Sequence, residues 1–161
     1  MAIAITLHIL ATILWIGGMF FAYMALRPAA ASLLEPPQRL PLWAATFARF
    51  FPWVWVSVVV LPATGYWMVF YVFDGLRQVG LHVHLMQGLG WLMIVIYLFV
   101  FFAPYRQLKA AVAAKDWPAG GKALARIRQL VGINLLLGIA LIGAGLAYVD
   151  ELRRRGGDID R

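Results

Sequence analysis

Residues 82–104 read HVHLMQGLGWLMIVIYLFVFFAP and contain no Asp, Glu, Lys or Arg. At a helical rise of about 1.5 Å per residue, this segment would be about 35 Å long, enough to cross the hydrocarbon core of a bilayer. Three further uncharged runs of similar length cover residues 2–26, 50–73 and 130–149. The pattern predicts four transmembrane helices.

The composition supports the same class. Of the 161 residues, 63% are hydrophobic and 13% are charged, an apolar excess well above that of a soluble domain. Because backbone polar groups must be paired inside a bilayer, such runs cross it as helices. We therefore expect an all-α, polytopic membrane four-helix bundle, with one domain over residues 1–155 and a disordered tail over 156–161.

The basic residues predict an orientation. The formal net charge of +7 is interpreted through lipid contact and topology, and no nucleic acid partner is expected. Nine of the 14 Lys and Arg residues fall in the first and third loops, which share one side of the bilayer: Arg27, Arg39, Arg49, Arg106, Lys109, Lys115, Lys122, Arg126 and Arg128. This excess predicts that both termini face the periplasm or exterior of a bacterial inner membrane.

Several helix ends can also be predicted. Residues 42–51 form an amphipathic stretch that is expected to lie in the interface before Pro52 opens the second span. Pro62 predicts a kink in that span, and the third helix is expected to continue past the membrane through residues 105–109. Asp116 is predicted to cap the start of the fourth helix.

His8, His82 and His84 are the three histidines, and each lies near the end of an apolar run. An ionisable side chain in hydrocarbon is costly unless something holds it, so these residues are the first candidates for a cofactor or metal site. In an up-and-down bundle the first and third spans begin on the same side. His8 and His84 are each expected about 8 Å into their helices, where they could ligate one metal from opposite sides.

Helix geometry separates the roles of His82 and His84. Positions two apart on a helix differ by about 200°, so only one of them can face His8. One turn deeper than His84 is Gly88, and one turn deeper than His8 is Thr12, so small residues would leave clearance for a flat macrocycle. We expect His8 and His84 as axial ligands of haem b, with His82 as a propionate or headgroup contact or a substitute ligand. The expected cofactor-binding residues are His8, His82, His84, Gly88, Thr12 and Trp15.

The apolar runs contain no Asp, Glu, Lys or Arg, so intramembrane acid–base chemistry would fall to histidine or tyrosine. Redox chemistry by a bound cofactor suits such a chain better than hydrolysis. The leading hypothesis is an oxidoreductase or electron carrier that uses a membrane quinol or a porphyrinogen. In a structural membrane subunit, by contrast, the histidines would only hydrogen-bond lipid headgroups or backbone carbonyls.

Short motifs carry a family resemblance. The stretches Leu7-His8 with Trp15-Ile16-Gly17-Gly18-Met19-Phe20, Arg49-Phe50-Phe51 with Thr64-Gly65, and Leu81-His82-Val83-His84-Leu85 resemble the copper-resistance D-like (CopD-like) integral membrane family. The resemblance covers most of residues 5–148. It implies copper uptake or delivery to the periplasm, with histidine and methionine ligands.

The copper interpretation selects different side chains from the haem interpretation. His82 and Met86 share one helix face at positions i and i+4, and together with His8, or with His8 and Met19, they would bind Cu(I). A weaker similarity to the four-helix membrane protoporphyrinogen oxidases rests on the first-helix histidine and a His-x-Lys motif, where this chain has His84 in place of the lysine. A homo-oligomer is compatible with each interpretation.

Overall fold

The computed structural model describes residues 2–73 and 81–157, with side chains described over residues 2–71 and 83–145. Within these residues, four helices are long and apolar enough to cross a membrane. They cover Ala2–Leu33, Pro36–Tyr71, Val83–Ala113 and Trp117–Gly145. The prediction of an all-α polytopic membrane bundle is confirmed.

The first span changes its helix type along its length. It consists of α1 (Ala2–Thr12), the π-helix η1 (Ile13–Gly17), α2 (Gly18–Phe21), the π-helix η2 (Ala22–Leu26) and α3 (Arg27–Leu33). A π-helix inserts an extra residue per turn, which shifts the faces that the following residues present. A Cβ atom at Gly18 would overlap the ring of Phe50, so the glycine permits a close approach of α2 to α4.

The second span is a single helix, α4 (Pro36–Phe73), which passes through Pro41, Pro52 and Pro62. Pro52 therefore lies within the helix and does not open the span as predicted, and the interfacial position of residues 42–51 stays a prediction. Trp43, Phe47 and Phe51 recur every four residues and are buried in the core. Burial of this face holds the helix together on both sides of Pro52, which local sequence alone would not predict.

The third span is broken in two, α5 (Leu81–Phe102) and α6 (Pro104–Ala113). Residues 105–109 are helical as predicted, but they belong to α6 and do not continue α5. The break is at Ala103, whose φ of −109° and ψ of −86° are not helical. A residue before proline is disfavoured in the α conformation, which accounts for the break.

The fourth span, α7 (Trp117–Gly157), begins as predicted. The Asp116 carboxylate accepts a hydrogen bond from the Ala119 N–H at 3.0 Å, as an N-cap does. The helix is described through Gly157, and the disordered tail expected over residues 156–161 stays a prediction. Residues 158–161 lie outside the described part of the chain.

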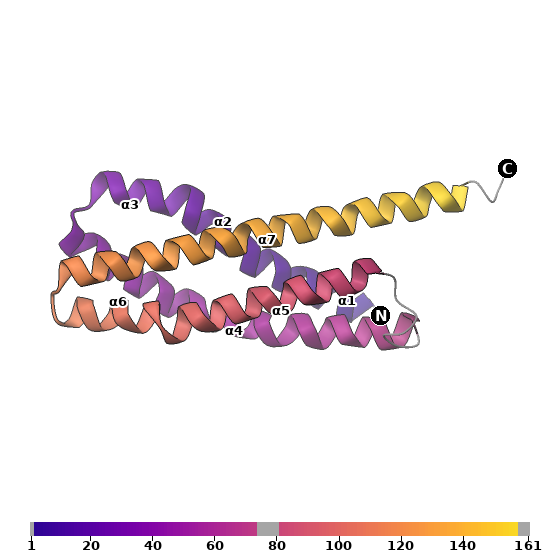
Figure 1. Cartoon of the computed structure of the whole chain (residues 1–161), viewed down its shortest axis with the longest axis horizontal. Coiled ribbons are helices and arrows are strands. Elements are labelled where there is room, and N and C mark those ends of the chain that lie inside the picture. The colour runs from indigo at the N-terminus through magenta and orange to yellow at the C-terminus, as the bar shows by residue number, and fades with distance from the viewer. Residues whose placement is uncertain (1, 74–80, 158–161) are drawn as a thin grey trace.

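The helices run up and down (Figure 1). The first span leads from the N-terminus to the α3–α4 connection, and α4 returns beside it to the end where the chain begins. Then α5 and α6 run back to the α6–α7 turn, and α7 returns beyond the rest of the bundle. The N-terminal end therefore carries the starts of α1 and α5, and the opposite end carries α3 and α6.

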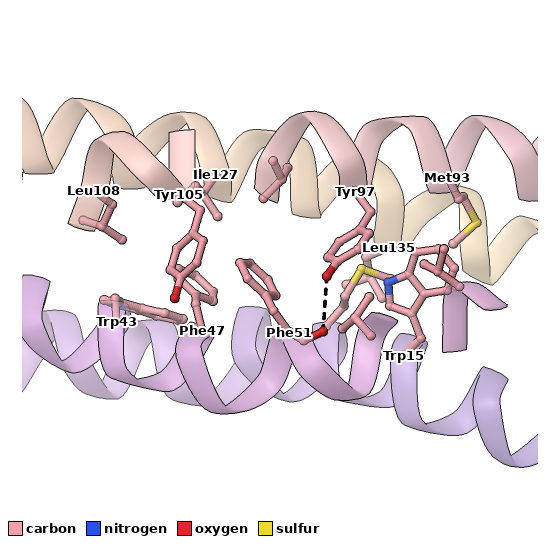
Figure 2. Close-up of a cluster of buried hydrophobic side chains, with 14 of the residues drawn as sticks. Trp15, Trp43, Phe47, Phe51, Met93, Tyr97, Tyr105, Leu108, Ile127 and Leu135 are labelled. Carbon is pink, nitrogen blue, oxygen red and sulfur yellow. Dashed lines mark hydrogen bonds between the residues drawn. The ribbon is translucent and has the colours of Figure 1, made fainter. Parts of the chain in front are cut away.

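An aromatic core joins α4 to α5 and α6 (Figure 2). Phe47 and Phe51 stack with ring centroids 5.2 Å apart, and Tyr105 meets the Phe51 ring edge-on at 4.8 Å. The Tyr97 hydroxyl donates a hydrogen bond to the Phe51 carbonyl at 3.2 Å. Trp15 from η1 packs edge-on against Tyr97, at 6.1 Å. Because these contacts tie three spans together, the centre of the bundle is fixed while its N-terminal end carries the histidines.

Candidate functional site

His8 is held by α4. Its Nδ1 atom lies 2.8 Å from the Oγ1 atom of Thr64, and a Cβ atom at Gly65 would be 3.7 Å from the His8 Cε1 atom. The His8 ring is half-buried, whereas Thr64 is only 9% exposed. The His8 carbonyl also accepts a hydrogen bond from the Thr12 hydroxyl at 2.8 Å. These contacts fix the ring edge that carries Nδ1 against the second span.

The hydroxyl of Thr64 determines which His8 nitrogen carries the proton. The Thr64 oxygen lies 2.6 Å from the Val60 carbonyl oxygen, a separation that requires a hydrogen between the two oxygens. The single hydroxyl hydrogen is thus directed to Val60, and Thr64 must accept from His8. Nδ1 therefore carries the hydrogen, and in the neutral ring Nε2 carries the lone pair. An imidazole held in this way presents Nε2 as a metal ligand. Metal-binding histidines commonly donate their other ring N–H to an outer partner in the same manner.

Gly138 on α7 sets the relative depth of the first and third spans. A Cβ atom there would lie 2.9 Å from Ile16 Cδ1 and 3.2 Å from Met93 Cε. Ile16 and Met93 therefore reach the same level of the bundle, from helices that run in the same direction (Figure 1). Each helical residue advances about 1.5 Å along the helix axis. His8 therefore lies about 12 Å from Ile16 along the first span, and Met86 lies about 10 Å from Met93 along the third span. Both displacements point to the same end of the bundle. His8 and Met86 consequently lie at similar depths, with the His8 ring turned towards α4 and the Met86 thioether turned towards α7.

Two methionines of α5 face two glycines of α7. The Met86 methyl group would be 3.7 Å from a Cβ atom at Gly145, and the Met93 methyl group meets Gly138. Both pairs are seven residues apart, as expected for antiparallel helices in one register. Met86 is half-buried and Met93 is 3% exposed. The two thioethers thus lie on one face of α5, with Met86 at the His8 level.

The expected haem residues are dispersed. The His84 side chain is exposed, and Gly88 is exposed with open space beside it. Trp15 is 3% exposed and occupied by the aromatic core. His82 lies in the first turn of α5, but its side chain is outside the described residues.

Among the described side chains, those of His84 and Trp15 do not form a haem pocket with His8. The open space beside Gly88 lies on the exposed surface of α5. Among the hydrogen bonds of the described residues, His8 pairs with Thr64 and not with His84. The described residues also contain no group of three or more His, Cys, Asp or Glu that could hold a metal ion. The axial pairing of His8 with His84 stays a prediction.

Thr64 is the site residue that sequence reasoning missed. The Thr64-Gly65 pair lies shortly after Pro62 in the sequence. A threonine and a glycine close to a proline within a helix indicate a position where another side chain can approach the helix. Asn134 on α7 bonds across helices, because its amide nitrogen donates to the Met93 carbonyl at 3.3 Å. The Asn134 carbonyl oxygen is buried without a partner among the described residues.

The fold and these contacts define a polytopic helical membrane protein with an oriented imidazole and thioethers at one end. The family model of copper resistance protein D (CopD) matches residues 44–148, which run from within α4 to within α7. The chain belongs to this family. Comparison with the curated proteins and with the solved structures gives no match. The matched segment contains Thr64, His82, His84 and Met86, and the first helix with His8 precedes it.

Proposed function

We propose that this chain is a copper-handling membrane protein that binds Cu(I) as its cargo, as a copper permease or a copper-delivery protein. The observation that carries the proposal is the His8 ring, whose Nδ1 is bound to Thr64 so that Nε2 is left as a ligand. Membership of the copper resistance protein D family supports copper as the metal.

The ligand set follows from the chemistry of Cu(I). This soft ion favours thioether and imidazole ligands, and the chain has no cysteine to supply a thiolate. Met86 lies at the depth of His8, and His82 is expected to share the face of Met86. His8, Met86 and His82 together would provide two imidazoles and one thioether, a donor set suited to Cu(I) and unsuited to Ca²⁺ or Mg²⁺.

Deeper thioethers extend the proposal into the membrane. Met19 and Met93 are 4% and 3% exposed and belong to the first and third spans. A cation in hydrocarbon needs ligands at successive depths, so these two methionines are the candidates for receiving Cu(I) from the outer site. In a delivery protein the ion would stay at His8, whereas in a permease it would pass these thioethers.

The proposal is tested by metal analysis of the purified full chain under reducing conditions. We expect about one Cu(I) per chain and no stoichiometric iron. Replacing a ligand, in His8→Ala or Met86→Leu, should weaken Cu(I) binding by at least tenfold against a chromogenic chelator. Met24→Leu is the matched control, because Met24 is 59% exposed on η2 and far along the first span from His8.

Specific results would overturn the proposal. The proposal fails if the chain retains no added Cu(I), or if Met24→Leu loses as much Cu(I) affinity as Met86→Leu. It also fails if the purified protein has a Soret band and stoichiometric iron. The last outcome would favour haem. Copper uptake by sealed proteoliposomes then separates the two forms of the proposal, since only a permease should accumulate the ion.

A further inference from the structure

A cavity of about 250 Å³ lies at the end of the bundle opposite His8. It is bordered by η2 and α3, by the first turns of α4 and by the first turns of α7. Three arginines line it, Arg27, Arg39 and Arg128, and none of the lining residues is an Asp or Glu. Three arginines that line one cavity, with no Asp or Glu among the other lining residues, favour an anion as its ligand.

The arginines are partly withdrawn from solvent. The side chains of Arg27 and Arg39 are half-buried, and Arg128 is exposed at the rim. The Arg27 guanidinium carbon lies 4.9 Å from the centroid of the Tyr23 ring, which keeps the charged group at the cavity. Burying a guanidinium costs free energy unless a counter-charge compensates it, so an anion that enters the cavity removes that cost.

The sequence around the cavity favours a position at the depth of lipid headgroups. Arg27 directly follows the uncharged run over residues 2–26, and Arg128 stands two residues before the run over residues 130–149. Deeper in the cavity the lining becomes apolar, with Ala22, Phe47 and Val131 among its residues. A ligand that fits this gradient has an anionic head and an apolar continuation towards the membrane.

We propose that this cavity binds the phosphate group of an anionic membrane phospholipid. Guanidinium groups match phosphate oxygens with paired N–H donors, and basic pockets between transmembrane helices bind such headgroups. The volume accommodates the phosphate with its glycerol, and the acyl chains would leave along the apolar lining. This inference is independent of copper binding, because its residues lie at the other end of the bundle.

The experiment is native mass spectrometry of the full chain in detergent with phosphatidylglycerol or phosphatidylcholine of identical acyl chains. We expect selective retention of phosphatidylglycerol, weakened about fivefold by each of Arg27→Gln, Arg39→Gln and Arg128→Gln. Arg106→Gln is the matched control, since Arg106 is exposed on α6 and does not line the cavity. Arg128→Gln keeps the test valid if a half-buried arginine proves necessary for folding, because Arg128 is at the exposed rim.

Three outcomes would overturn the proposal. Equal retention of the two lipids would exclude recognition of the anionic headgroup. Equal losses in Arg106→Gln and Arg128→Gln would indicate general attraction to the basic face. Displacement of phosphatidylglycerol by millimolar inorganic phosphate would assign the cavity to a soluble phosphate compound instead of a lipid.

Discussion

Thr64→Val is the substitution that tests the orientation of His8 most sharply. Valine keeps the size of threonine but removes the oxygen that accepts from His8 Nδ1 at 2.8 Å. A hydrogen bond of this kind contributes about 1 to 1.5 kcal/mol, and losing it frees the ring to rotate and to change tautomer. Since about 1.4 kcal/mol corresponds to a factor of ten, we expect Cu(I) affinity to fall about tenfold. Loss of one outer partner of a metal ligand commonly has an effect of about this size.

The assay is competition for Cu(I) between the purified chain and a chromogenic chelator. Thr64→Ser restores the hydroxyl and should bind within about twofold of the wild type. Equal affinities of Thr64→Val and Thr64→Ser would refute the argument that Thr64 orients the ligand.

Three further predictions concern the bundle itself. Leu108→Ala removes a side chain with 0% exposure and should lower the free energy of unfolding by about 2 to 5 kcal/mol, whereas Leu136→Ala, at 70% exposure, should change it little in a thermal unfolding assay. Tyr97→Phe removes the hydrogen bond to the Phe51 carbonyl but keeps the ring contacts, so we expect a loss of about 0.5 to 1.5 kcal/mol in the same assay, and a larger loss would contradict the assigned contact. Because the chain has no cysteine, Glu35→Cys and Lys115→Cys can be labelled singly with a membrane-impermeant maleimide, and both should react from the cytoplasmic side alone. Opposite sidedness of these two labels would contradict the up-and-down topology, and joint labelling from the exterior would reverse the predicted orientation.

The fold could be predicted because hydrocarbon imposes strong constraints on sequence. Runs of about 20 uncharged residues have few alternatives to a spanning helix, so the four spans follow from residues 2–26, 50–73, 82–104 and 130–149. The helix ends outside the bilayer depend instead on tertiary packing and on the positions of prolines. Tertiary packing of Trp43, Phe47 and Phe51 keeps α4 continuous across Pro52, and Pro104 breaks the third span at Ala103. Neither effect can be read from hydrophobicity.

The candidate site could be predicted only in part. Scarcity of ionisable residues drew attention to His8, and the structure places its Nδ1 beside the Thr64 hydroxyl, a contact that the sequence did not predict. Which face His8 presents depends on the packing of α1 against α4 and on the π-helices that follow it, and periodicity of 3.6 residues does not capture either. The similar depth of His8 and Met86 follows from the contacts of Gly138 with Ile16 and Met93, which join three spans and which the sequence of one span does not predict.

The central claim is that His8 and Met86 ligate one Cu(I), and X-ray absorption at the copper edge of the loaded protein measures this directly. The account predicts both nitrogen and sulfur scatterers in the first coordination shell at about 2.0 to 2.3 Å, with the sulfur lost in Met86→Leu and one nitrogen lost in His8→Ala. A shell that contains no sulfur, or that is the same in the wild type and in both variants, would contradict it.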